Sequence, residues 1–172
     1  IIGLGFSLLT GGYLFYLAKT TNVKDLQNAL KATTIIYDKN GDQAGSLTGQ
    51  KGTYVELDAI SENLQNAVVA TEDRSFYKNS GINYGRFFLA ILTLGRSGGG
   101  STITQQLAKN AYLSQDQTVE RKAKEFFLAL EINKKYSKKE ILTMYLNNAY
   151  FGNGVWGIED ASKKYFGVSA SQ

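Results

Sequence analysis

The sequence predicts a mainly α-helical fold, and three observations lead to this prediction. Proline is absent from all 172 residues, so no residue forces a helix to break. Ser61 has the side chain of a helix N-cap and precedes apolar residues at Leu64 and Val68, which are spaced to lie on one helix face. Residues 137–140 read Ser-Lys-Lys-Glu, a capping box that starts a further helix.

Composition removes several classes of chemistry. The chain contains neither cysteine nor histidine, which excludes disulfides, thiol nucleophiles, Ser-His-Asp triads and the usual zinc sites. Acid–base chemistry would therefore come from carboxylates, supported by Lys, Arg, Gln and hydroxyl groups. The net charge of +4 suits an anionic partner such as a phosphate or an acidic membrane, and it is too small to indicate nucleic acid.

The first 18 residues are uncharged and are followed by Lys19. About 20 apolar residues are needed to cross a bilayer core of roughly 30 Å, so residues 1–18 are at the lower limit for a transmembrane helix. A secretory signal is the alternative, but no small-residue cleavage pattern follows the run. We therefore expect an uncleaved anchor over residues 1–18, a short polar connector over residues 19–32, and one domain over residues 33–172.

A β-hairpin is predicted at the start of this domain. Residues 33–37, Thr-Thr-Ile-Ile-Tyr, favour a strand, and the Asn40-Gly41 pair that follows is typical of a hairpin turn. Residues 45–52 have the composition of a loop. Residues 53–57, Thr-Tyr-Val-Glu-Leu, are therefore expected to be the returning strand.

Residues 70–81, Ala-Thr-Glu-Asp-Arg-Ser-Phe-Tyr-Lys-Asn-Ser-Gly, contain the candidate for a general base. Glu72 and Asp73 are neighbours at the end of an apolar run over residues 67–70. Burial beside apolar residues raises the pKa of a carboxyl group, toward the range that a general base needs near neutral pH. The alternative is a helix that ends in two solvated charges.

Residues 84–94 are almost wholly apolar apart from Arg86. A helix with apolar residues on all sides is either buried in the core or dips into a membrane, and both interpretations stay open.

Residues 95–101, Gly-Arg-Ser-Gly-Gly-Gly-Ser, form a glycine-rich loop that runs into a predicted helix. The loop is not a nucleotide-binding P-loop, because Ser101 stands where that motif requires lysine. A loop that opens onto a helix N-terminus with hydroxyl groups at the cap is still suited to bind an anion. On this helix Gln105 and Lys109 are four residues apart, so they share a face.

A later helix combines a guanidinium with a second carboxylate. Arg121 and Glu125 have the spacing of an ion pair on one helix face, which contributes only about 0.3–0.5 kcal/mol when exposed. As functional groups they offer a guanidinium for phosphate oxygens and a carboxylate for a hard cation. Further helices are expected through residues 141–146 and up to residues 165–167.

Taken in order, five motifs resemble the peptidoglycan glycosyltransferases, the domain shared by class A penicillin-binding proteins and monofunctional transglycosylases. The matches cover roughly residues 33–167, and the second motif is highly specific. The motifs are Glu72-Asp73-x-x-Phe76 ending in Gly81; Gly100-Ser101-Thr102-Ile103-x-Gln105-Gln106-x-x-Lys109-Asn110; Arg121-Lys122-x-x-Glu125; Tyr145-Leu146-Asn147 reaching Gly152; and Gly157 through Ala161 to Tyr165-Phe166-Gly167.

The resemblance implies a mainly helical, lysozyme-like domain of two lobes, beside the short N-terminal β-hairpin and the transmembrane helix. Such a domain polymerises lipid II into β-1,4-linked glycan strands by inverting glycosyl transfer and releases undecaprenyl pyrophosphate. It would lie on the extracellular face of the cytoplasmic membrane on a single-pass anchor. Its partners would be the membrane, lipid II, the growing glycan strand, and cell-wall synthesis and division proteins, with no nucleic acid. Because the family domain continues past Gly167, we expect residues 33–172 to be truncated at the C-terminus.

The resemblance also implies roles for individual residues. Glu72 resembles the general base that deprotonates the 4-hydroxyl of the acceptor's GlcNAc, whose oxygen then attacks C1 of the donor MurNAc. Glu125 resembles the second catalytic carboxylate, near the donor pyrophosphate, where it could hold a divalent cation such as Mg²⁺ or Mn²⁺. The other matched residues are expected to bind substrate: Asp73, Ser101, Thr102, Gln105, Gln106, Lys109, Asn110, Arg121 and Lys122.

Two positions depart from the family pattern, since Asn79 stands where His is usual and Gln117 falls near the place of a common Arg. Two other functions stay open, a lysozyme-like glycan hydrolase and a non-catalytic, membrane-anchored scaffold of the cell-wall machinery. A hydrolase needs two carboxylates that flank the sugar bond and has no use for a dense set of cations. A scaffold needs neither the carboxylates nor the cations.

Overall fold

The computed structural model describes residues 12–13, 15–16, 20, 23, 26–31, 33–48, 51–86, 100–113 and 118–172. Within these ranges the chain is mainly helical, as the sequence predicts. The elements in chain order are α2 (Leu26–Lys31), β1 (Thr33–Tyr37), β2 (Gln43–Thr48), the 3₁₀ helix η1 (Leu57–Ala59), α3 (Glu62–Glu72), α5 (Ile103–Tyr112), α6 (Val119–Lys135), α7 (Lys138–Asn148) and α8 (Ile158–Phe166).

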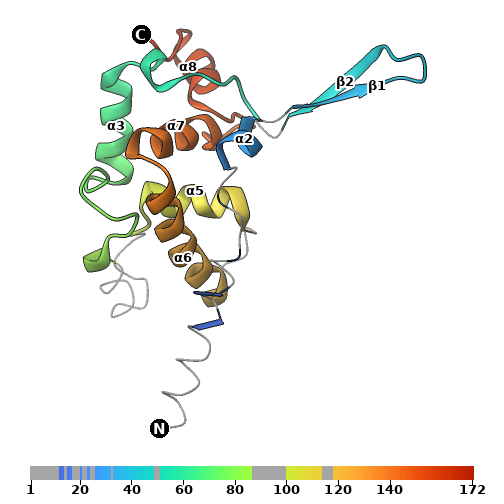
Figure 1. Cartoon of the computed structure of the whole chain (residues 1–172). Helices are drawn as coiled ribbons and strands as arrows, with labels where there is room; N and C mark the ends of the chain where they lie inside the picture. Colours follow the sequence, from blue (N-terminus) through green and yellow to red (C-terminus); the bar gives the residue numbers. More distant parts are fainter. Residues whose placement is uncertain are drawn as a thin grey trace.

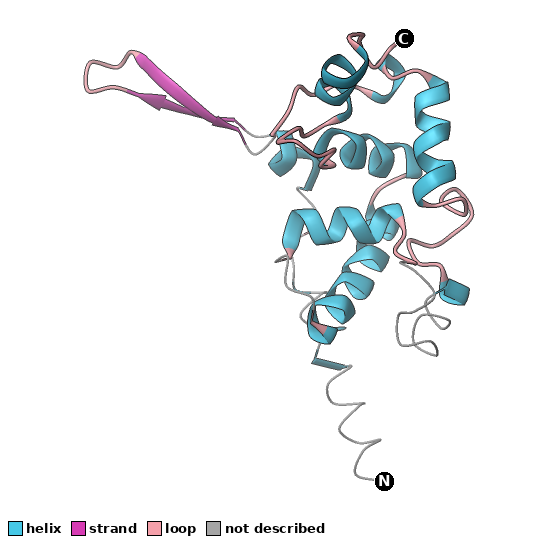
Figure 2. Ribbon diagram, turned by 180° about the vertical axis from the view of Figure 1, so that it is seen from behind, coloured by secondary structure: helices cyan, strands magenta, loops and turns pink. Residues whose placement is uncertain are grey.

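The described helices pack around α5 and α7. Helix α5 contacts both α6 and α7, while α3 stands along one side of the body and α8 lies near the C-terminus (Figure 1). The β-hairpin projects from the side opposite α3, as both views show (Figures 1 and 2). Buried apolar side chains of α5, α6 and α7 form the centre of the core: Ile103, Leu107, Leu128, Ile132, Ile141, Leu142 and Leu146.

A tight turn closes the hairpin. The carboxylate of Asp38 accepts hydrogen bonds from the backbone amides of Asn40 at 2.8 Å and Asp42 at 2.9 Å. The bonds from Asp42 and then Asn40 hold the pKa of Asp38 below its usual value. Gly41 has a φ of +88°, which a residue without a Cβ adopts at little cost. The strands pair antiparallel from this turn, with Tyr37 opposite Gln43.

The prediction of a returning strand at residues 53–57 is wrong, because residues 43–48 form the returning strand directly after the turn. Residues 53–56 instead run along α7, where Asn147 takes the place of a strand neighbour. The Asn147 side chain is fully buried, and its Oδ1 accepts from the Val55 amide at 2.8 Å. Its Nδ2 donates to the carbonyls of Val55 and Thr143, both at 2.8 Å. The carboxamide thus satisfies both backbone groups of Val55 without a second strand.

Helix starts follow the sequence signals closely. Ser61 caps α3 by accepting from the Leu64 amide at 3.4 Å, and Ser137 forms the predicted capping box with Glu140. These bonds from the Ser137 backbone and side chain lower the pKa of Glu140. The last helix ends where it was predicted to end, with Gly167 in the left-handed conformation after Phe166.

Several predictions fall outside the described residues. They concern the anchor over residues 1–18 apart from positions 12–13 and 15–16, the apolar run over residues 87–94, the glycine-rich loop up to residue 99, and residue 117. Within the described ranges, none of the helices has both the length and the apolar character that crossing a membrane requires.

The Asn147 contacts predict a large loss of stability when this side chain is removed. We expect Asn147→Ala to lower the free energy of unfolding by about 3 kcal/mol, because it leaves the Val55 amide and carbonyl without partners. Asn148→Ala is the matched control, since Asn148 makes one bond to the Met144 carbonyl within its own helix and should cost about 1 kcal/mol or less. Urea unfolding of the three forms measures the difference, and equal losses would contradict the prediction.

Candidate active site

Three side chains from three helices form a hydrogen-bonded row around the predicted base. Glu72 is the last residue of α3, and its side chain is exposed. Its Oε2 accepts from Nε2 of Gln106 on α5 at 2.9 Å. Oε1 of Gln106 accepts in turn from the hydroxyl of Tyr145 on α7 at 3.0 Å. A carboxamide has one donating and one accepting end, so the bond from Tyr145 fixes which end faces Glu72.

Tyr145 keeps its proton in this row. The residue is only 6% exposed, and burial, together with the negative charge of Glu72, raises the pKa of its hydroxyl well above the usual value. A tyrosine that stays protonated is a permanent donor. Gln106 therefore turns its amino group toward the carboxylate at any pH near neutrality.

The two neighbouring carboxylates have opposite environments. We expected Glu72 to be desolvated by the apolar run before it, and this is wrong: Glu72 is exposed, while Asp73 is buried with 3% of its surface accessible. Helix α3 lies at the side of the body and buries none of its residues completely, so the apolar run covers little of its end. The desolvated carboxylate of the pair is Asp73.

Both carboxylate oxygens of Asp73 accept hydrogen bonds from groups of the protein. Its Oδ1 accepts from the amide of Ser75 at 3.2 Å and from the Ser75 hydroxyl at 2.9 Å. Its Oδ2 accepts from Nδ2 of Asn79 at 2.9 Å and from the amide of Ile103 at 3.3 Å. The side chain predicted to bind substrate lies below the surface, where it joins the end of α3 to the start of α5.

A second cluster surrounds Glu125 on α6. This carboxylate is 1% exposed, and its Oε2 accepts from the guanidinium of Arg121 at 3.2 Å, which confirms the predicted i,i+4 pair. Its Oε1 pairs with the ammonium of Lys122, which also donates to the hydroxyl of Ser101 at 2.5 Å. The Nε atom of Arg121 is buried without a partner among the described residues. The cluster thus keeps cationic donors next to the loop that leads into α5.

The residues around Glu125 do not fit a divalent cation at this position. Both carboxylate oxygens already face a cation, Arg121 on one side and Lys122 on the other. A Mg²⁺ or Mn²⁺ ion prefers several oxygen ligands, and no group of three or more acidic or histidine side chains gathers anywhere in the described part of the chain. The divalent cation stays a prediction.

Two predicted substrate-binding residues shape the start of α5. Thr102 and Gln105 form a capping box, in which each side chain bonds the backbone amide of the other. The Thr102 hydroxyl also donates to the carbonyl of Gly81 at 2.6 Å. Gly81 has a φ of +91°, and a Cβ at this position would lie 2.7 Å from the carbonyl oxygen of Ala129 on α6. Only glycine therefore fits where the end of the first motif passes between α5 and α6.

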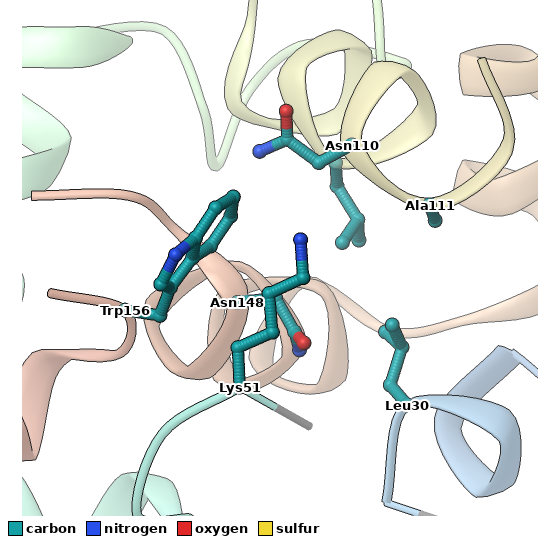
Figure 3. A pocket seen from close by; sticks show the side chains of 7 residues that line it. Leu30, Lys51, Asn110, Ala111, Asn148 and Trp156 are labelled. Carbon is teal, nitrogen blue, oxygen red and sulfur yellow. The ribbon is translucent and has the colours of Figure 1, made fainter. Parts of the chain in front are cut away.

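Lys109 and Asn110 follow on the next turn of α5. The Lys109 side chain is half-buried and forms no ion pair or hydrogen bond with the residues that the structure describes. Asn110 is exposed on the rim of a pocket between α5 and α7, one helical turn from Gln106 (Figure 3). The pocket is lined by Leu30, Lys51, Leu107, Asn110, Ala111, Asn148 and Trp156.

Sequence reasoning missed some residues of this region. Lys51 places its ammonium 3.9 Å from the centroid of the Trp156 ring, and both side chains face the pocket beside Asn110 (Figure 3). Nothing in the local sequence around Lys51 indicated this contact, because its partner is distant in the chain. Tyr145 was recognised as part of a motif, but its bond to Gln106 depends on how α5 and α7 pack.

Comparison with known proteins agrees with these features. A family model described as Transglycosylase matches residues 40–172. The chain is 80% identical over all its 172 residues to penicillin-binding protein 2a of Streptococcus pneumoniae serotype 2 (strain D39 / NCTC 7466) and covers 24% of that protein. It is 40% identical to penicillin-binding protein 1A of Aquifex aeolicus (strain VF5), with 97% of the chain and 24% of the relative covered. It is 45% identical to penicillin-binding protein 1F of Bacillus subtilis (strain 168), with 80% of the chain and 20% of the relative covered.

The chain belongs to the transglycosylase family, because this family model covers most of it. It spans about a fifth to a quarter of the length of these curated relatives.

The Glu125 cluster predicts a stability difference between two glutamates of α6. We expect Glu125→Gln to lower the free energy of unfolding by about 3 kcal/mol, because Arg121 and Lys122 lose a buried counter-charge. Glu131→Gln is the matched control, since its partner Lys134 is largely exposed and the pair should contribute about 0–1 kcal/mol. Equal midpoints for the two variants in urea unfolding would show that Glu125 does not balance these cations.

Proposed function

We propose that this chain is the peptidoglycan glycosyltransferase domain of a longer, membrane-anchored protein. In this function it joins lipid II units into β-1,4-linked glycan strands and releases undecaprenyl pyrophosphate. Membership of the transglycosylase family supports the reaction class. The observation that carries the residue assignment is the exposed carboxylate of Glu72, oriented by Gln106 and Tyr145.

Helix α5 connects the proposed base to the proposed phosphate-binding groups. Gln106 on its second turn contacts Glu72, and Ser101 just before its first turn accepts a hydrogen bond from Lys122. A base must meet the attacking hydroxyl, while cations must meet the departing pyrophosphate. Placing both next to one rigid helix holds them in a fixed relation to a substrate bound between them.

The proposed reaction is a single displacement with inversion. Glu72 accepts the proton of the acceptor's 4-hydroxyl as that oxygen attacks C1 of the donor sugar, and the C1–O bond to pyrophosphate breaks. The negative charge that develops on the leaving pyrophosphate is stabilised by Arg121 and Lys122, with Lys109 and Ser101 as further donors. With no histidine in the chain, a carboxylate is the group that must be deprotonated for this step.

The arrangement around Glu125 favours transfer over hydrolysis by two flanking carboxylates. Both oxygens of Glu125 are engaged with cations, so this residue is not free to act as a second acid or nucleophile at a sugar bond. We propose instead that Glu125 positions Arg121 and Lys122 for the pyrophosphate. Asn110 and the adjoining pocket, one turn beyond Gln106, then lie beside the proposed catalytic row.

The membrane-related features are also part of this proposal. We propose that residues 1–18 anchor the protein, residues 19–32 connect, and residues 33–172 belong to a two-lobed, lysozyme-like catalytic domain on the extracellular face of the cytoplasmic membrane. A substrate with a polyprenyl tail would reach such a domain along the membrane. The net charge of +4 supports attraction to an anionic lipid pyrophosphate and to acidic headgroups.

The base assignment predicts a large loss of activity from a small change. Glu72→Gln keeps the shape of the side chain and removes the proton acceptor, so we expect polymerisation of purified lipid II to fall by roughly 10²–10⁴-fold. Binding of a pyrophosphate-mimicking inhibitor such as moenomycin should stay near normal, because the amide still fills the site. The measurement is glycan product separated by length, using the full-length protein.

Glu62→Gln is the matched control for this prediction, because Glu62 is an exposed glutamate in the first turn of the same helix. It should polymerise lipid II at the normal rate. Long glycan strands made by Glu72→Gln at a near-normal rate would overturn the mechanism. Short muropeptides in place of polymer as the product of the unaltered protein would point to a hydrolase.

The orienting role of Tyr145 predicts a smaller effect. Tyr145→Phe keeps the ring in the core and frees the Gln106 amide to rotate, so we expect kcat to fall roughly fivefold, as for the loss of one neutral hydrogen bond. Tyr165→Phe is the control, because it also removes a hydroxyl, one that donates to the Phe151 carbonyl on another part of the surface. Unchanged kcat in Tyr145→Phe would show that Gln106 is oriented by other contacts.

A further inference from the structure

Lys138 occupies a position that the proposed mechanism does not use. It is the first residue of α7, and its side chain is half-buried. Its ammonium lies 4.7 Å from the centroid of the fully buried Phe76 ring and donates a hydrogen bond of 3.0 Å to Oδ1 of Asn79. Burial lowers the pKa of Lys138, and the negative charge of Asp73 opposes this change. Because partial burial of an ammonium is unfavourable, these contacts indicate a structural role for Lys138 in addition to solubility.

Asn79 forms a neutral bridge between this ammonium and a carboxylate. Its Nδ2 donates to Oδ2 of Asp73 at 2.9 Å, while its Oδ1 accepts from the backbone amide of Gly81 at 2.9 Å as well as from Lys138. The oxygen faces two donors and the nitrogen faces an acceptor, so the reversed amide would lose all of these bonds. The lysine therefore helps to fix the orientation of the carboxamide.

Asp73 transmits this constraint to the proposed base. Its Oδ2 also accepts from the amide of Ile103, the first residue of α5, at 3.3 Å. Glu72, the preceding residue, accepts from Gln106 three residues further along the same helix. The end of α3 is thus attached to α5 at two points one turn apart. Movement of Asp73 would change the direction of the Glu72 carboxylate.

We propose that Lys138 is a positioning residue for Glu72 and acts through the Asn79 carboxamide and Asp73. The inference rests on the proposed function, in which Glu72 is the base. The ammonium holds the oxygen end of the amide, the nitrogen end holds the Asp73 carboxylate, and that carboxylate holds the end of α3. The ammonium itself lies against the Phe76 ring, and its hydrogen bond goes to Asn79.

The test compares Lys138→Met and Lys138→Arg with Lys139→Met in the full-length protein. Lys139 is the exposed neighbour on the same turn, so its replacement removes the same charge without touching the bridge. We expect Lys138→Met to lower kcat for lipid II roughly tenfold at an unchanged KM, which corresponds to one charge-assisted hydrogen bond. Lys138→Arg should recover most of the rate, and Lys139→Met should leave it unchanged.

A double-mutant cycle with Asn79→Leu tests the path through the amide. If both residues act through one bridge, the Lys138→Met, Asn79→Leu double variant should be no slower than the slower single variant. The same non-additivity is expected in urea unfolding, which is measured without substrate. Circular dichroism at the assay temperature gives the folded fraction, by which each kcat is corrected.

Three outcomes would overturn the positioning role: equal kcat for Lys138→Met and Lys139→Met, a rise in KM that accounts for the whole loss, and a loss that disappears after correction for folded protein. Additive effects in both cycles would overturn the bridge. Failure of the unaltered protein to polymerise lipid II would overturn the proposed function instead, and the unfolding cycle would then decide on the bridge alone.

Discussion

The attachment of the C-terminal end of α3 to α5 is the constraint on which the rest of the site depends. Asp73 accepts from the first amide of α5, and Glu72 accepts from the side chain of Gln106 one turn later. Two contacts about one turn, or roughly 5 Å, apart fix both the position and the direction of a helix end. A buried carboxylate is costly unless it is hydrogen-bonded, and Asp73 has partners for both oxygens. The buried carboxylate of Asp73 thus helps to hold the exposed carboxylate of Glu72 in place.

Helix α5 shows how a motif that is typical of ligand binding also serves the fold. Thr102 and Gln105 direct their polar atoms into the capping box and toward Gly81, whereas Gln106 faces Glu72. Backbone amides without hydrogen-bond partners at a buried helix start would destabilise the domain. Some polar side chains of the motif therefore have to form hydrogen bonds with the backbone. The side chains of this motif that can contact a ligand are those that reach the surface, such as the exposed Asn110.

Local signals in the sequence predicted much of the fold, and packing decided the rest. The starts of α3 and α7 followed from Ser61 and Ser137, because capping depends on residues within one turn. The returning strand was misplaced, since the bond between Asn147 and Val55 joins residues distant in sequence. The ion pair of Glu125 was predictable from spacing along one helix. The different burial of two adjacent carboxylates was not, because it depends on which face of α3 meets α5.

Under the proposed function, the difference in burial between Glu72 and Asp73 allows a carboxylate base to meet two opposing requirements. A base that must reach a sugar hydroxyl has to be exposed at the surface, yet an exposed side chain on a helix end samples many directions. In the structure, two neighbouring residues meet these two requirements. Asp73 is buried and accepts several hydrogen bonds, which fix the end of the helix, while Glu72 stays exposed with one oriented partner. Under the proposed function, the bound sugar would supply the desolvation that the apolar run before Glu72 does not. Water would then be excluded from the carboxylate only when the acceptor is in place, which ties proton transfer to a filled site.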